Sequence, residues 1–187
     1  MARIPYVDPS TAPDEVRAAF DALPAHLNIF RTMAHATNSF RPLLRLGSSI
    51  LGEQQLDPKL REYAILLAAR SLGGRYEWVQ HVPIAIACGA TQEQVDALER
   101  GELDAAVFGD VERRFLAFVQ ESIDDTRPSD ATFEAASSKF SSRELVETLL
   151  TVGYYQMLAR LTECMDVELD EPIGMKVVKS ATANRRS

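Results

Sequence analysis

Three residues with acid–base side chains, Glu62, Glu77 and His81, stand at spacings that suit proton transfer. Glu77 and His81 are four positions apart, so on a helix their side chains would share one face. Near the N-terminus of such a helix the dipole favours neutral imidazole, which can shuttle protons beside a carboxylate. The alternative interpretation is an exposed Glu77–His81 pair that stabilises its helix by about 0.3–0.5 kcal/mol and has no chemical role. The spacing alone leaves both interpretations open.

Two expected helices would carry these residues. Asp57 followed by Pro58 marks a helix start, and the Ala- and Leu-rich run that follows predicts a largely buried helix to about Leu72. The pair Gly73-Gly74 ends it, since glycine accepts the left-handed conformation at a helix C-terminus. A second helix is expected over residues 76–87. The tight turn between them predicts two antiparallel neighbours.

Helical patterns and capping residues continue along the rest of the chain. Further helices are expected over about residues 11–23, 26–37, 40–52, 91–100, 110–124, 129–140 and 142–165. The last of these is apolar around much of its circumference, so it would either run through the domain centre or meet another subunit. The sequence predicts an all-α protein: an extended arm over residues 1–10, one helical domain over 11–168, and a polar, frayed C-terminal tail over 169–187.

Composition limits the classes of function. The 187-residue chain is 46% hydrophobic, which suffices for one core, and its net charge of −7 argues against a nucleic-acid or anionic-membrane partner. It has no secretory apolar segment and no membrane-length apolar run. Two distant cysteines, Cys88 and Cys164, form no CxxC pair and predict no disulfide framework. The three histidines lack metal-ligand spacing, so no metal is expected. A cytoplasmic location is the expectation.

The segment from Arg61 to His81, REYAILLAARSLGGRYEWVQH, resembles a motif of the alkylhydroperoxidase D-like and carboxymuconolactone decarboxylase family. In that family the pattern is R-E-x₁₁-C-x-x-C-x₃-H, and Glu62 and His81 match its Glu and His. Gly74 and Glu77 occupy the two cysteine positions. The strings YEWVQHVPIAIACGAT and SSRELVETLLTVGYYQMLARLTECMDVEL also resemble cysteine-free members. The resemblance extends over about residues 20–168 and indicates the branch without CxxC.

The resemblance implies a helical bundle of the alkylhydroperoxidase D-like type that assembles as a homo-oligomer (dimer, trimer or hexamer) and binds a small molecule without a cofactor. Without the cysteine pair, the thiol mechanism of the peroxidase branch is excluded at this site. The decarboxylase branch removes CO₂ from a small lactone and must protonate the resulting dienolate. By analogy, His81 would be the acid or base, Glu62 would orient it, and Glu77 would be a second proton acceptor.

Substrate binding would fall to residues close to these three. Arg61 or Arg75 would anchor an acidic substrate through a bidentate ion pair, and Trp78 would line the pocket beside His81. Three functions remain open: a lyase or isomerase acting on a small lactone or enolisable organic acid, a peroxidase or antioxidant protein using Cys88 or Cys164, and a non-catalytic ligand-binding oligomer.

Overall fold

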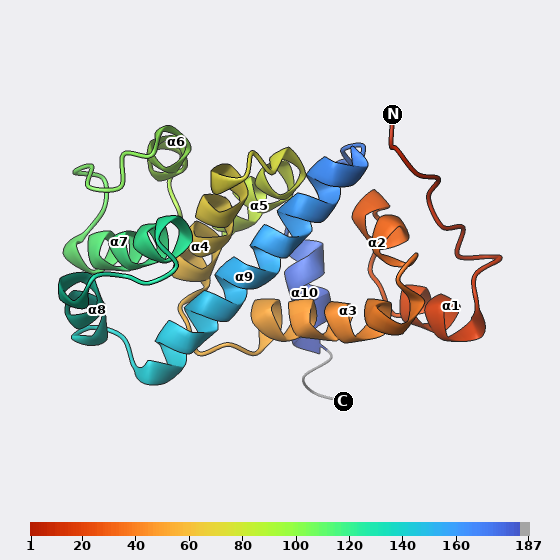
Figure 1. Cartoon of the computed structure of the whole chain (residues 1–187), viewed down its shortest axis with the longest axis horizontal. Coiled ribbons are helices and arrows are strands. Elements are labelled where there is room, and N and C mark those ends of the chain that lie inside the picture. Colours follow the sequence, from red (N-terminus) through yellow and green to blue (C-terminus); the bar gives the residue numbers. More distant parts are fainter. Residues whose placement is uncertain (184–187) are drawn as a thin grey trace.

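The computed structural model describes residues 1–183, and this part of the chain folds into α-helices without strands (Figure 1). The all-α prediction is confirmed, as one helical domain. The helices are α1 (Asp14–Asp21), α2 (Asn28–Met33), α3 (Thr37–Gly52), α4 (Pro58–Ser71), α5 (Arg75–Ala87), α6 (Gln92–Arg100), α7 (Asp110–Asp124), α8 (Asp130–Ser137), α9 (Ser142–Met165) and α10 (Met175–Ala183).

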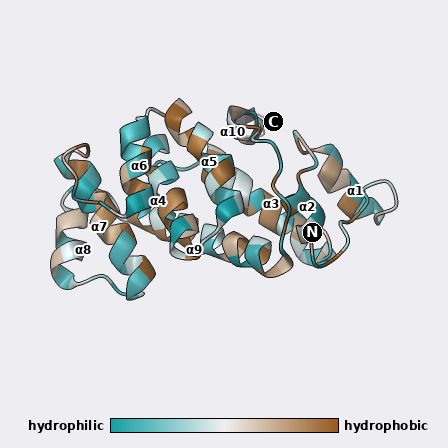
Figure 2. Ribbon diagram, turned by 90° about the horizontal axis from the view of Figure 1, so that it is seen from above, coloured by the Kyte–Doolittle hydropathy of each residue, from teal (hydrophilic) through white to brown (hydrophobic). Residues whose placement is uncertain are grey.

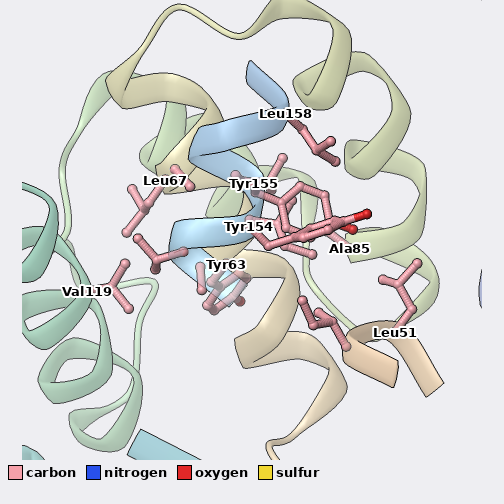
Figure 3. Close-up of a cluster of buried hydrophobic side chains, with 14 of the residues drawn as sticks. Leu51, Tyr63, Leu67, Ala85, Val119, Tyr154, Tyr155 and Leu158 are labelled. Atoms are coloured by element: carbon pink, nitrogen blue, oxygen red, sulfur yellow. The ribbon is translucent and has the colours of Figure 1, made fainter. Parts of the chain in front are cut away.

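Helix α4 is the centre of the core, and every residue from Leu60 to Ala69 is buried. The chain reverses at Gly73, which has a φ of +66°, and α5 then packs back along α4. Helix α9 packs on both, and its Tyr154, Tyr155 and Leu158 meet the α4–α5 pair in the buried cluster of Figure 3. Helices α4 and α5, which are adjacent in sequence, and the distant helix α9 therefore form the central frame of the molecule.

Side-chain caps fix where the central helices begin. The Asp57 carboxylate accepts hydrogen bonds from the backbone N–H groups of Lys59 and Leu60, at 2.9 and 3.2 Å. At the start of α9, the Ser141 hydroxyl accepts from the Glu144 N–H, and the Glu144 carboxylate accepts from the Ser141 N–H. These local bonds explain why the starts of α4 and α9 agree with the sequence analysis.

Two groups of helices flank this frame (Figure 1). Helices α1–α3 lie on one side of the molecule and α6–α8 on the other, with α9 running between them. Helix α5 lies between α9 and α10 and contacts both (Figure 2). The N-terminal arm has no helix over residues 1–10 and is attached by backbone hydrogen bonds from Arg3 to Met165 and from Val7 to Arg31.

The segment after residue 169 differs from the frayed tail expected from the sequence. It forms α10, which packs on α3 and α5 and buries Val178 and Ala181. Gly52 makes close packing possible, because a Cβ there would lie 2.9 Å from the Ala181 backbone. The tail is therefore structured by a contact with a distant helix. Residues 184–187, also part of the expected tail, lie outside the described residues.

Four further helices differ from expectation at their ends, with α1 beginning at Asp14 and α8 ending at Ser137, each three residues inside the expected range. Helix α2 spans only Asn28–Met33, and α3 begins at Thr37, three residues earlier than the apolar stripe suggested. Within residues 1–183, no helix has both the length and the apolar character needed to cross a membrane.

Candidate active site

The centre of the candidate site is a hydrogen bond between α4 and α5. His81 Nδ1 lies 2.8 Å from Glu62 Oε2, although the residues are 19 positions apart. The Glu62 side chain is fully buried, and that of His81 is 10% exposed. The antiparallel packing of the two helices across the Gly73 turn brings the two side chains together. The structure thus pairs the two residues that carry the sequence resemblance.

Arg61 holds the other side of the Glu62 carboxylate. Its Nε and Nη2 atoms donate to Glu62 Oε1 at 3.0 and 2.9 Å, and its Nη1 donates to the Leu51 carbonyl at 2.9 Å. A bidentate guanidinium favours an ionised carboxylate, so Glu62 Oε2 accepts the hydrogen bond from His81. The proton on His81 is thereby assigned to Nδ1, and Nε2 carries the lone pair.

His81 Nε2 faces open space. It makes no hydrogen bond to another described residue, yet within residues 1–183 no buried side-chain nitrogen or oxygen lacks a partner. The atom must therefore reach the surface of a cavity, and His81 is one of the residues that line it. The ring packs edge-on against Tyr155, with centroids 4.8 Å apart, which fixes its orientation. This arrangement presents an oriented base to a ligand.

The cavity has a volume of about 820 Å³ and lies between α1, α2, α3, α5, α9 and α10. Its lining is mostly apolar, from residues such as Leu27, Ile29, Phe30, Leu44, Leu51, Ile84, Tyr154 and Leu158. The polar groups on its α5 wall are Tyr76, Glu77, Gln80 and His81. A cavity of this size, with largely apolar walls and convergent polar groups, is typical of a small-molecule site.

Glu77 is a second buried carboxyl group on the cavity wall. It is 2% exposed, and both its oxygens lie 3.1 Å from the Thr162 hydroxyl of α9. No Lys or Arg of the described residues forms an ion pair with it. Burial raises the pKa of Glu77, and its own backbone N–H, Thr162 and His81 offset that rise in part. Glu62 is thus a buried carboxyl group with an arginine partner, whereas Glu77 is a buried carboxyl group without a Lys or Arg partner among the described residues.

The three residues predicted to bind substrate lie elsewhere. Arg61 is committed to Glu62 and the Leu51 carbonyl, Arg75 is exposed at the start of α5, and Trp78 is half-buried against the hydrophobic core. None of the three lines the cavity formed by the described residues. Sequence proximity to His81 does not determine which helix faces close the cavity, and a substrate-binding role for these three residues stays a prediction.

Two arginines that the sequence analysis did not single out do line the cavity. Arg41 and Arg45 are one turn apart on α3, both are exposed, and neither forms an ion pair with another residue of the described chain. Glu15 and Glu53 also border the cavity, so its rim carries both signs of charge. The i,i+4 spacing of the arginines was visible in the sequence, but the role of α3 as a cavity wall was not.

Neither cysteine takes part in this site. Cys88 is half-buried at the end of α5, where burial raises the pKa of its thiol, and Cys164 is exposed near the end of α9. Neither lines the cavity. In the described part of the chain, no cluster of three or more His, Cys, Asp or Glu side chains is arranged to hold a metal ion.

One family model and several solved structures are similar to this chain. Residues 38–121, which include both residues of the Glu62–His81 pair, match the carboxymuconolactone decarboxylase family. A search of curated proteins gave no significant match.

Solved structures share the fold at low sequence identity. An uncharacterised peroxidase-related protein from Ralstonia eutropha JMP134, with an alkylhydroperoxidase AhpD core, is 19% identical, with a TM-score of 0.77 over 91% of this chain and 93% of its own. A peroxidase-related protein from Silicibacter sp. TM1040 is 17% identical, with a TM-score of 0.75 over 90% and 92%. The debrominase Bmp8, in complex with 2,3,4-tribromopyrrole, is 16% identical, with a TM-score of 0.73 over the whole of both chains. Residues 38–121 thus resemble the carboxymuconolactone decarboxylase family, as the sequence motif predicted, and the fold of the chain is that of the AhpD-like structures.

Proposed function

We propose that the protein is a cofactor-free enzyme that moves protons on a small lactone or enolisable organic acid, in the manner of a carboxymuconolactone decarboxylase. The observation that carries this proposal is the fixed His81 ring. Its Nδ1 is bonded to Glu62, which is itself held by Arg61, while its Nε2 opens on an apolar cavity. A base oriented in this way removes a proton from a bound substrate without first reorganising.

In the proposed reaction, His81 Nε2 accepts a proton from a carbon next to a carbonyl group. The resulting imidazolium is stabilised by the Glu62 carboxylate at 2.8 Å. Arg61 fixes the Glu62 carboxyl group in place through two hydrogen bonds, so it serves as a positioning residue. When the substrate is a lactone acid, no C–H proton is removed first: the C–C bond to the carboxylate breaks, CO₂ leaves, and the bond's electron pair enters a dienolate. His81 in its imidazolium form, protonated from solvent, then protonates a carbon of that dienolate.

The cavity supports a substrate with an apolar body and an acidic group. Its apolar walls suit the body, and Arg41 and Arg45 are the arginines that line it. A guanidinium binds a carboxylate with paired hydrogen bonds, which would hold the acidic group at the rim while the carbon skeleton extends toward His81.

The test is solvent deuterium incorporation, followed by proton NMR, into a panel of carboxymuconolactone-type lactones and enolisable keto acids. We expect wild-type protein to exchange the acidic C–H of at least one panel member, and His81→Ala to slow that exchange by about 10²–10⁴-fold, the usual contribution of a general base. His35→Ala is the matched control, because His35 is exposed and bonds only to the Pro5 carbonyl. Equal exchange in wild type and His81→Ala would refute the assignment.

We also propose that the chain forms a homo-oligomer through the outer face of α9. Four apolar side chains at helical spacing, Val146, Leu149, Leu150 and Met157, are 38–56% exposed there. Light scattering at several concentrations should show an assembly for wild type and a smaller species for Leu150→Glu. A monomeric wild-type protein would contradict this proposal.

A further inference from the structure

The hydroxyl of Thr162 has more acceptors around it than it has hydrogens. Its Oγ1 lies 3.1 Å from each oxygen of Glu77 and 3.2 Å from the carbonyl oxygens of Leu158 and Ala159. A threonine hydroxyl carries one hydrogen and can accept through two lone pairs. An ionised Glu77 would compete with the two carbonyls for that hydrogen. A protonated Glu77 resolves the competition, because it donates to Oγ1 while Thr162 donates to a helix carbonyl.

Besides Thr162, the Glu77 carboxyl group has its own backbone N–H as a hydrogen-bond donor in the first turn of α5, and its titratable neighbours add little to stabilise a negative charge. The titratable groups facing it are His81 on its own helix, Glu163 and Tyr155 on α9, and Tyr76. Only His81 can carry a positive charge, and its strong acceptor is Glu62. Burial raises the pKa of Glu77, in agreement with the hydrogen count.

We propose that Glu77 is held as a neutral carboxylic acid and donates a proton to the substrate oxygen while His81 removes one from carbon. This inference rests on the proposed function of His81, and it reverses the role of second proton acceptor expected from the sequence. Glu77 and His81 are one helical turn apart, with Cβ atoms expected about 5–6 Å from each other, so they can serve two neighbouring atoms of one ligand. Both residues line the cavity.

The coupled step balances within the site. The C–H electron pair of the substrate becomes a C=C bond as the proton goes to His81 Nε2. The carbonyl π pair moves to oxygen and takes the proton of Glu77, which becomes a carboxylate, and the ligand becomes an enol. In the return step the imidazolium protonates a different carbon of the conjugated system, and the enol O–H returns its proton to Glu77. The substrate class is therefore an unsaturated lactone or keto acid that undergoes a 1,3-proton shift.

A measurement on the free protein tests the neutral acid without any substrate. In protein labelled with ¹³C at the glutamate carboxyl carbons, NMR spectra across pH should contain one resonance that keeps the shift of a protonated carboxyl at neutral pH. That resonance should vanish in Glu77→Gln and persist in Glu163→Gln, which removes a nearby carboxylate exposed on α9. If the Glu77 resonance instead titrates in the ordinary glutamate range, the proposal is wrong.

A second variant protects the test against misfolding of Glu77→Gln. Thr162→Ala keeps Glu77 and removes its hydroxyl partner, so the same resonance must move, and an unchanged resonance would overturn the proposal. In the deuterium assay, Glu77→Gln keeps a hydrogen-bond donor but no transferable acid proton, and we expect exchange to slow by about 10²-fold or more. If NMR shows a neutral Glu77 but no panel member exchanges deuterium, the assignment of Glu77 as a neutral acid is retained and the assignment of His81 as the base is rejected.

Discussion

Replacing Arg61 with Met should destabilise the protein far more than the loss of an ordinary surface arginine. Arg61 is 4% exposed and satisfies one oxygen of the fully buried Glu62 as well as the Leu51 carbonyl. Methionine fills much of the same space but leaves the Glu62 carboxylate with His81 as its remaining partner. Removing one member of a buried ion pair costs about 3–5 kcal/mol, because the other charge is left uncompensated. For a domain of this length, that corresponds to a fall in Tm of roughly 6–20 °C.

Urea unfolding followed by circular dichroism measures this cost, with wild type and variants compared at one protein concentration. Arg114→Met is the matched control, since Arg114 forms an exposed ion pair with Asp110 on α7 that should contribute about 0.2–1 kcal/mol. The double variant Arg61→Met/Glu62→Gln should be less destabilised than the sum of its single variants, because it removes both charges and leaves neither of them buried without its partner. Equal losses for Arg61→Met and Arg114→Met would refute the electrostatic account of the site.

Three further outcomes can be measured with the same protein. Gly74→Ala should lower the free energy of unfolding by about 1–3 kcal/mol, because the new Cβ would lie 2.8 Å from the Cβ of Ala159. Gly153→Ala, where a new Cβ would meet open space, should raise the free energy of unfolding by about 0.5–1 kcal/mol. Equal effects of the two variants would contradict the packing argument. Burial raises the pKa of Glu77 above 4.5, so its contribution to the free energy of unfolding should fall as pH rises from 4.5 through the folded-state pKa, and Glu77→Gln should lack that fall. The exposed thiol of Cys164 should react with a thiol reagent before that of Cys88, without loss of deuterium exchange; inactivation by that first modification would instead favour a thiol enzyme.

The sequence was sufficient for the parts of the fold that depend on local chemistry. Caps at Asp57 and Ser141 and the turn at Gly73 depend on neighbouring residues, so the starts of α4 and α9 and the reversal between α4 and α5 could be predicted. The Glu62–His81 pair was also accessible, because the two helices that carry it are adjacent in sequence and joined by a tight turn.

The sequence was not sufficient where distant segments meet. Helix α10 packs on α3, which precedes it by more than a hundred residues. The same limit explains why Arg61 was assigned to substrate and Arg41 was overlooked. Arg61 is bound within the core by the Leu51 carbonyl of α3, and Arg41 lines the cavity only because α3 forms one of its walls.

The contact between Gly74 and α9 bears on how this lineage can change. Gly74 occupies the first cysteine position of the family motif, and a Cβ placed there would lie 2.8 Å from Cβ of Ala159. A mutation to cysteine at this position would introduce the thiol together with a Cβ that clashes with α9. Recovery of the dithiol would need at least a cysteine in place of Glu77 and a local retreat of α9 as well. The close contact at Gly74 therefore opposes any side chain at this position, a thiol included, unless α9 shifts.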